Sequence, residues 1–119
     1  MEDIYTKEFL FYYKNQKNRQ DLKKYTTKGR EVNLSCGDDL TVKLLIKNGI
    51  VFDIGYTGEG CAVCEGSMSI LSEYLENKSV KDITGLTKKD FLKLINIKLT
   101  PSRENCSLIG FNATKKAIK

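Results

Sequence analysis

The sequence contains no histidine, and this absence excludes several kinds of site at once. Without imidazole, neither a Ser/His/Asp triad nor a Cys/His pair can form, and thiolates and carboxylates would have to bind any transition metal. The chain also lacks a run of about 18 apolar residues and a charged-then-apolar N-terminus that ends in small residues. We therefore expect neither a membrane span nor a secretory signal, and we predict a cytoplasmic protein.

The length and composition are those of one ordinary globular domain. A chain of 119 residues with 40% hydrophobic residues predicts a single domain over residues 1–119 with one modest core, and no internal repeat is visible. The formal net charge is +5, and basic residues concentrate in the segment Lys14–Arg30 and near the C-terminal end. Because acidic residues are interspersed and no nucleic-acid recognition motif accompanies them, we expect a solvated surface that binds no nucleic acid. An acidic protein partner remains open.

The first half of the chain predicts a helix followed by an antiparallel sheet. Ile4–Tyr13 carries apolar and aromatic side chains among charged ones, which is typical of a helix that packs on a core. Asn48-Gly49 is a two-residue hairpin signal between two strand-like segments. The predicted strands are Val32–Leu34, Thr41–Lys47 and Ile50–Tyr56.

The second half of the chain predicts helices. After Gly60 the apolar period changes from two to about 3.6, which indicates a helix that begins near Cys61. A turn near Thr84-Gly85 precedes a short helix capped by Thr87, with Asp90 three residues later, and Pro101 marks the start of the last helix. The order of elements predicts an α+β fold, with helices packed on a three-stranded antiparallel sheet.

Three of the four cysteines have surroundings suited to a metal or sulfur site. In a reducing compartment, cysteines indicate metal binding or catalysis before they indicate disulfides. Cys36 and Cys61 lie beside glycines, and Cys61 falls at a helix start, where the helix dipole favours a thiolate. Cys106 falls on the stripe of small residues in the last helix. We expect these three residues to meet at one end of the sheet.

Four segments of the chain carry a combined pattern. They are Tyr12–Asn18, Asn33–Asp38, Gly58–Cys61 and Pro101–Cys106. Together they resemble the NifU-type iron–sulfur cluster assembly family, which includes IscU scaffolds and SufU sulfur acceptors. Gln16 and Lys17 stand where the family's first motif has proline and arginine. The resemblance covers most of the chain and implies the SufE/NifU-like fold.

The resemblance also implies a site. By it, Cys36, Asp38, Cys61 and Cys106 would bind zinc or a transient [2Fe–2S] cluster. Cys36 and Cys106 are the candidate persulfide acceptors, and Arg103 is the candidate cation that offsets the negative charge of the ligands. Soft thiolates suit both zinc and iron–sulfur clusters, and a single carboxylate is a more exchangeable ligand than a fourth thiolate.

Residue statistics alone leave simpler roles open for three of these positions. Asp38 could cap the bend at Cys36-Gly37, and Arg103 could be a solvated charge at a helix start. Cys64 forms a C-x-x-C pair with Cys61 but lies in the apolar arc of the predicted helix. A small buried side chain is the favoured interpretation of Cys64, and a spare ligand or a redox partner of Cys61 is the alternative.

The resemblance implies a carrier rather than a stand-alone enzyme. A pyridoxal-phosphate cysteine desulfurase would supply persulfide sulfur, and apo iron–sulfur proteins would receive the cluster. The alternative is a zinc-dependent sulfur acceptor, a sulfurtransferase of the SufU type, and a third candidate is a small zinc-stabilised interaction module. Asn105 stands where IscU-type members have histidine, but the short interval between Cys61 and Cys106 is IscU-like. We do not expect an Hsp70-type chaperone to bind, because its recognition segment is replaced by Leu99–Arg103.

Overall fold

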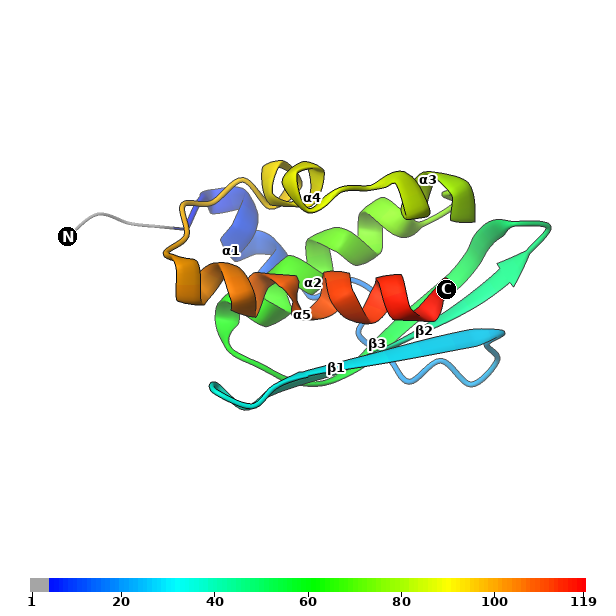
Figure 1. The fold of residues 1–119 in the computed structure, drawn as a ribbon, viewed down its shortest axis with the longest axis horizontal. Coiled ribbons are helices and arrows are strands. Elements are labelled where there is room, and N and C mark those ends of the chain that lie inside the picture. The colour runs from blue at the N-terminus through cyan, green and yellow to red at the C-terminus, as the bar shows by residue number, and fades with distance from the viewer. Residues whose placement is uncertain (1–4) are drawn as a thin grey trace.

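The structure is a computed structural model that describes residues 5–119, and helices cover one face of a small sheet (Figure 1). The sheet is antiparallel with strand order β1-β2-β3, which confirms the predicted α+β fold. Along the chain the elements are α1 (Lys7–Lys14), β1 (Thr27–Asn33), β2 (Asp38–Lys47), β3 (Ile50–Glu59), α2 (Ala62–Leu75), α3 (Val80–Gly85), α4 (Lys88–Ile95) and α5 (Pro101–Ala117).

The first helix begins later than the sequence predicts. Thr6 caps α1, because its hydroxyl oxygen accepts a hydrogen bond of 3.0 Å from the Phe9 N–H. Ile4, the first residue of the predicted helix, lies outside the described residues. The Phe9 side chain is buried and packs on Gly66 of α2, whereas Tyr13 is 36% exposed. The helix therefore docks on the core mainly through one aromatic ring.

The hairpin between β2 and β3 has the predicted turn. Asn48 and Gly49 have φ values of 53° and 75°, as a type I′ turn requires. Leu40, Val42 and Leu44 alternate along β2 and are fully buried, so one face of the sheet lies against the helices.

The first strand is longer than predicted and ends earlier. The prediction Val32–Leu34 was wrong at both ends, because β1 runs from Thr27 to Asn33 and Leu34 lies in the following turn, 92% exposed. The segment before Val32 is polar and lacks a strand-like alternation. Pairing with β2 and close packing on α5 form the strand instead, and a Cβ at Gly29 would lie 2.0 Å from the Ala113 carbonyl oxygen.

The later helices follow the capping signals, with one addition. Cys61 is the N-cap residue of α2, Thr87 and Asp90 form a capping box on α4, and α5 starts at Pro101, all as predicted. The turn expected near Thr84-Gly85 is the end of a six-residue helix, α3, which the sequence did not reveal. Such a helix is too short to show an apolar period, and Ile83 is its one fully buried residue.

Two connections and one helix meet at one end of the sheet and shape the candidate site. The turn between β1 and β2 carries Cys36, the step from β3 into α2 carries Cys61, and the second turn of α5 carries Cys106. Within residues 5–119, no helix is long and apolar enough to cross a membrane.

Candidate metal centre

The turn between β1 and β2 presents Cys36 to solvent. The Asn33 carbonyl accepts a hydrogen bond of 2.8 Å from the Gly37 N–H, and the Asn33 side chain accepts one of 3.0 Å from the Ser35 N–H. Gly37 has a φ of +77°, a conformation that favours glycine. Asn33 therefore closes the bend, and Cys36 is exposed at its tip.

Asp38 is the first residue of β2 and is only 2% exposed. Its Oδ1 accepts a hydrogen bond of 3.0 Å from the Cys61 N–H, and its Oδ2 lies 3.7 Å from the Cys61 sulfur. A buried carboxylate needs polar partners, and the partner of Asp38 is Cys61 rather than the bend at Cys36-Gly37. The arrangement favours a site role for Asp38 over the turn-capping alternative.

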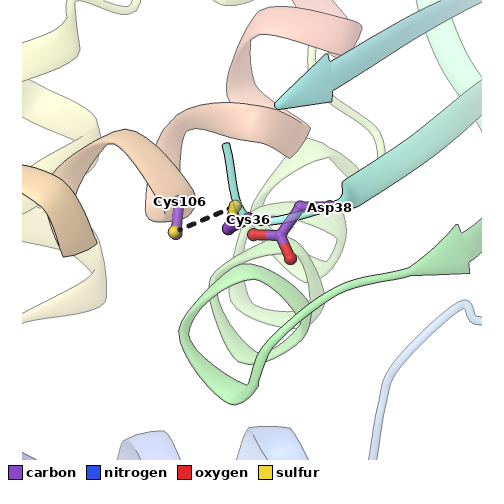
Figure 2. Close-up of side chains that lie close together, drawn as sticks. All are labelled: Cys36, Asp38 and Cys106. Atoms are coloured by element: carbon purple, nitrogen blue, oxygen red, sulfur yellow. Dashed lines mark hydrogen bonds between the residues drawn. The ribbon is translucent and has the colours of Figure 1, made fainter. Parts of the chain in front are cut away.

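Cys106 brings a second sulfur to Cys36 from α5. The two Sγ atoms are 3.5 Å apart, and Figure 2 shows Asp38 beside this pair. The ligand atoms of Cys36, Asp38 and Cys106 all lie within 4.8 Å of one another, close enough to share one ion. Burial, the contact with Cys36 and the nearby Cys61 and Asp38 raise the pKa of the Cys106 thiol.

Cys61 lies at the edge of this group. It is exposed, and its sulfur is near Asp38 but not within 4.8 Å of all three ligand atoms. As the N-cap residue of α2, it has no side-chain hydrogen bond to the helix, so its sulfur is not used in capping. Three of the four predicted ligands thus form a compact group, and the fourth contacts that group through Asp38.

Cys64 and Arg103, the two auxiliary candidates, have different surroundings. Cys64 is fully buried, which confirms the prediction of a small buried side chain, and burial raises its thiol pKa. Arg103 is exposed at the start of α5, and its Nη1 lies 3.3 Å from the Tyr5 hydroxyl oxygen. Arg103 also lines a pocket of about 380 Å³ together with Ser35, Cys36, Asn105 and Cys106. A cation is therefore present at the mouth of the site.

Sequence reasoning missed a group of polar residues beside the loop that leads into Cys61. Glu65, in the first turn of α2, accepts hydrogen bonds from Gln16, Arg19 and the Gly60 N–H. The only sequence signal was Gln16, which stands where the family motif has proline. No local pattern connects Gln16 with Glu65, because the two residues meet only in the folded chain.

The donor set fits a thiophilic metal. Three thiols and one carboxylate match the ligands that zinc and iron–sulfur clusters take in proteins, and magnesium or calcium would require oxygen ligands. Three thiolates and a carboxylate around a divalent ion carry a formal charge of about −2, which the Arg103 guanidinium would partly offset.

Comparison with known proteins finds relatives that match nearly the whole chain. The chain is 26% identical to the iron–sulfur cluster assembly scaffold protein IscU of Thermotoga maritima, over 98% of this chain and 93% of the relative. It is 21% identical to the zinc-dependent sulfurtransferase SufU of Bacillus subtilis, over 99% of this chain and 91% of the relative.

The fold also matches a crystal structure from Fervidobacterium islandicum AW-1, of a protein described as a candidate iron–sulfur cluster assembly scaffold for the SUF system. The TM-score is 0.84 at 21% identity, over 98% of this chain and 97% of the other. The family model of the NifU-like N terminal domain matches residues 4–119. Because that match spans nearly the whole sequence, the chain belongs to the NifU-like N-terminal domain family.

Proposed function

We propose that this protein is a scaffold for iron–sulfur cluster assembly. A cysteine desulfurase would deliver persulfide sulfur to Cys36 or Cys106, iron would enter, and an external electron donor would reduce the sulfur to sulfide. The resulting labile [2Fe–2S] cluster would pass to apo iron–sulfur proteins. The observation that carries the proposal is the group formed by Cys36, Asp38 and Cys106, whose ligand atoms lie within 4.8 Å of one another. The family membership and the names of the relatives support the same role.

The exposure of the sulfurs suits sulfur delivery. In this step a site thiolate attacks the terminal sulfur of the donor persulfide, and the donor cysteine leaves as a thiolate. Cys36 is exposed on a turn and lines the open pocket beside α5, so a donor residue can reach it. Cys106 is partly buried but lies only 3.5 Å from Cys36, so either sulfur can be the acceptor. The protein would act with its donor and recipients rather than turn over a small substrate alone.

The mixed ligand set suits cluster release. A cargo cluster must leave the scaffold, and a carboxylate oxygen binds iron less firmly than a thiolate does. Asp38 can supply that weaker ligand, because its Oδ2 lies near the sulfurs while its Oδ1 keeps the Cys61 amide in place. The Cys61 loop could thus stay ordered while the bond to the cargo is exchanged.

The second candidate function is a zinc-dependent sulfur acceptor of the SufU type. Asn105 provides no imidazole ligand beside Cys106, and the SufU relative matches nearly the whole chain. Zinc would then be a resident ion held by Cys36, Asp38, Cys61 and Cys106, and it would keep the thiols deprotonated until one of them accepts sulfur.

Anaerobic reconstitution tests both candidates. The protein is incubated with Fe²⁺, L-cysteine, a cysteine desulfurase and a thiol reductant, and visible absorbance, metal content and transfer to an apo-ferredoxin are measured. A scaffold gains [2Fe–2S] absorbance and activates the ferredoxin. Retained stoichiometric zinc, stimulated desulfurase and no cluster absorbance would overturn the scaffold proposal and support the acceptor.

Replacement of single cysteines tests the site itself. Cys106→Ser should abolish cluster assembly, because it removes one sulfur of the close pair. Cys64→Ala is the matched control, since this thiol is fully buried and outside the group of ligand atoms. Assembly that survives Cys106→Ser, or that is lost in Cys64→Ala, would contradict the proposed ligand set.

A further inference from the structure

Three side chains that bind no cargo in the proposed function are linked to the loop that leads into Cys61. Two of them form hydrogen bonds with the loop directly, and the third binds to these two. Glu65 lies in the first turn of α2, and Gln16 and Arg19 lie in the segment between α1 and β1. We call these three residues the loop clamp. Their position next to a candidate ligand raises the question of whether they stabilise the fold only, or also set the geometry of the metal centre.

Glu65 uses both of its carboxylate oxygens. Oε1 accepts hydrogen bonds of 2.6 Å from Arg19 Nη1 and 2.9 Å from Gln16 Nε2. Oε2 accepts a hydrogen bond of 3.0 Å from the Gly60 N–H, one residue before Cys61. The Glu65 side chain is 16% exposed, so water screens these charge-assisted bonds only in part.

Arg19 connects the clamp to the same loop at a second point. Its Nη2 donates a hydrogen bond of 2.5 Å to the Gly58 carbonyl, and its Nη1 also donates one of 2.7 Å to Gln16 Oε1. The segment that carries Arg19 is itself bound to β3, because the Asn18 carbonyl accepts a hydrogen bond from the Tyr56 N–H. The loop is thus fixed at Gly58 and at Gly60, on both sides of Glu59.

The loop has little freedom to take another path. Gly58 has a φ of +124°, and a Cβ at Gly60 would lie 2.6 Å from the Cys64 sulfur. Two carboxylates hold successive amides here, Glu65 that of Gly60 and Asp38 that of Cys61. If Asp38 turns to a metal or a cluster, the bond from Glu65 remains and keeps the start of α2 in place.

We infer that Glu65, held by Arg19 and Gln16, is a positioning residue that keeps Cys61 facing Asp38 and so sets the metal affinity of the site. The inference rests on the proposed function of the site. It also gives Gln16 a role, because proline, which the family pattern has at this position, carries no side-chain amide. The simpler alternative is that Glu65 only stabilises the first turn of α2 through the helix dipole.

Metal binding by the metal-free protein distinguishes these roles. Zn²⁺ affinity is measured by competition with a chromophoric chelator, and Co²⁺ is used as a second probe because its thiolate charge-transfer absorbance reports the number of sulfur ligands. Glu65→Gln should lower the Zn²⁺ affinity about tenfold, the lower end of the effect of outer-shell partners. The Co²⁺ charge-transfer absorbance should fall as Cys61 is lost from the ligand set.

Two further variants test the clamp as a unit. Arg19→Lys keeps the charge but loses the forked geometry, so the Zn²⁺ affinity should fall by a smaller factor. If far-UV circular dichroism shows that Glu65→Gln does not fold, Arg19→Lys carries the test alone. Arg19→Met and Glu65→Gln are also compared with the double variant that combines them. The double variant should bind Zn²⁺ no more weakly than the weaker-binding single variant, because both substitutions act through one set of contacts.

Glu31→Gln is the matched control, since it makes the same substitution in a partly exposed ion pair, with Lys116, away from the clamp. It should leave the Zn²⁺ affinity unchanged. Clamp variants that melt at lower temperature but bind Zn²⁺ and Co²⁺ like the unmodified protein would overturn the inference and leave the proposed function standing. If the unmodified protein itself binds neither ion, the proposed function fails, and the inference fails with it.

Discussion

At the scale of single residues, the surroundings of Cys106 in the metal-free site raise the pKa of its thiol. Burial is the first cause of its raised pKa, followed by the hydrogen bond to Cys36 and the nearby Cys61 and Asp38. The thiol is therefore protonated at neutral pH, whereas metal binding requires the thiolate. Metal must displace this proton, so the protonation of Cys106 links metal affinity to pH.

We predict that Zn²⁺ binding to the metal-free protein releases protons at pH 7 and that its affinity decreases as the pH is lowered. Calorimetric titrations in buffers of different ionisation enthalpy measure the number of protons. The stability of the metal-free fold should show the opposite pH dependence, because as the pH rises the unfolded chain loses this thiol proton first, near pH 8.5. Its stability should therefore fall as the pH rises above that value. A pH-independent Zn²⁺ affinity between pH 6 and pH 8 would contradict the first prediction.

Asp38 supports a second prediction at this scale. Asp38→Ala removes the exchangeable oxygen ligand, so a reconstituted cluster should leave more slowly, and cluster absorbance in the presence of an apo-ferredoxin measures the rate. Asp39→Ala is the matched control, because Asp39 is the neighbouring carboxylate and pairs with Arg30 outside the site. An unchanged cluster lifetime in Asp38→Ala would disprove its role as the weak ligand.

At the scale of elements, the site depends on how closely α5 approaches β1. Gly29 lets the two backbones meet, and a Cβ there would lie 2.0 Å from the Ala113 carbonyl oxygen and 2.7 Å from the Ala117 nitrogen. Backbone atoms cannot move aside as a flexible side chain can. A side chain at Gly29 would therefore push α5, which carries Cys106, away from the strand that leads to Cys36.

Gly29→Ala should lower the free energy of unfolding by about 1–3 kcal/mol, the usual cost of overpacking, and should also slow cluster assembly. Urea unfolding and the reconstitution assay measure the two effects. Gly85→Ala is the control, because among the described residues only its chain neighbours and the backbone of its own helix can lie within 4 Å of a Cβ at that position. Equal stability of the two variants would show that α5 adjusts freely on the sheet.

The sequence predicted the elements that local contacts determine better than those that long-range packing determines. Turn and cap chemistry is local, so Asn48-Gly49, Thr87 with Asp90, and Pro101 identified their boundaries correctly. The polar half of β1 is formed by its pairing with β2 and its contact with α5. Such long-range causes leave no period in the sequence, and α3 is too short to show one.

At the scale of the whole molecule, the candidate site shows the same division between local and long-range information. The family motifs placed Cys36, Asp38, Cys61 and Cys106 in one site, and the structure brings together the ligand atoms of all of them except Cys61. Two features were not predicted: the hydrogen bond from the Cys61 amide to Asp38, and the loop clamp. In both, the partners come from distant segments of the chain. Motifs identify candidate ligands, whereas the fold determines which side chains hold those ligands in place.

The position of the site relative to the core leads to a prediction about folding. The core is formed by side chains of the sheet and of the helices that cover it, and Leu44, Leu71 and Phe91 are fully buried in it. The candidate ligands instead cluster at one end of the sheet, in two connections, the first residue of β2 and one helix. The apolar core should therefore hold the chain folded without a metal, unlike a zinc-stabilised interaction module, which unfolds on chelation.

Chelation should accordingly leave the far-UV circular dichroism spectrum unchanged and lower the melting temperature. An ion at a concentration of 100 times its Kd adds about 2.7 kcal/mol of stability, which corresponds to roughly 10 °C for a chain of this size. Cys36→Ser/Cys106→Ser is the matched control, since it should melt at the same temperature with and without the ion. Loss of helical signal on chelation would mean that the ligand group helps to form the fold, and the protein would then resemble a structural zinc module more than a carrier that empties and refills.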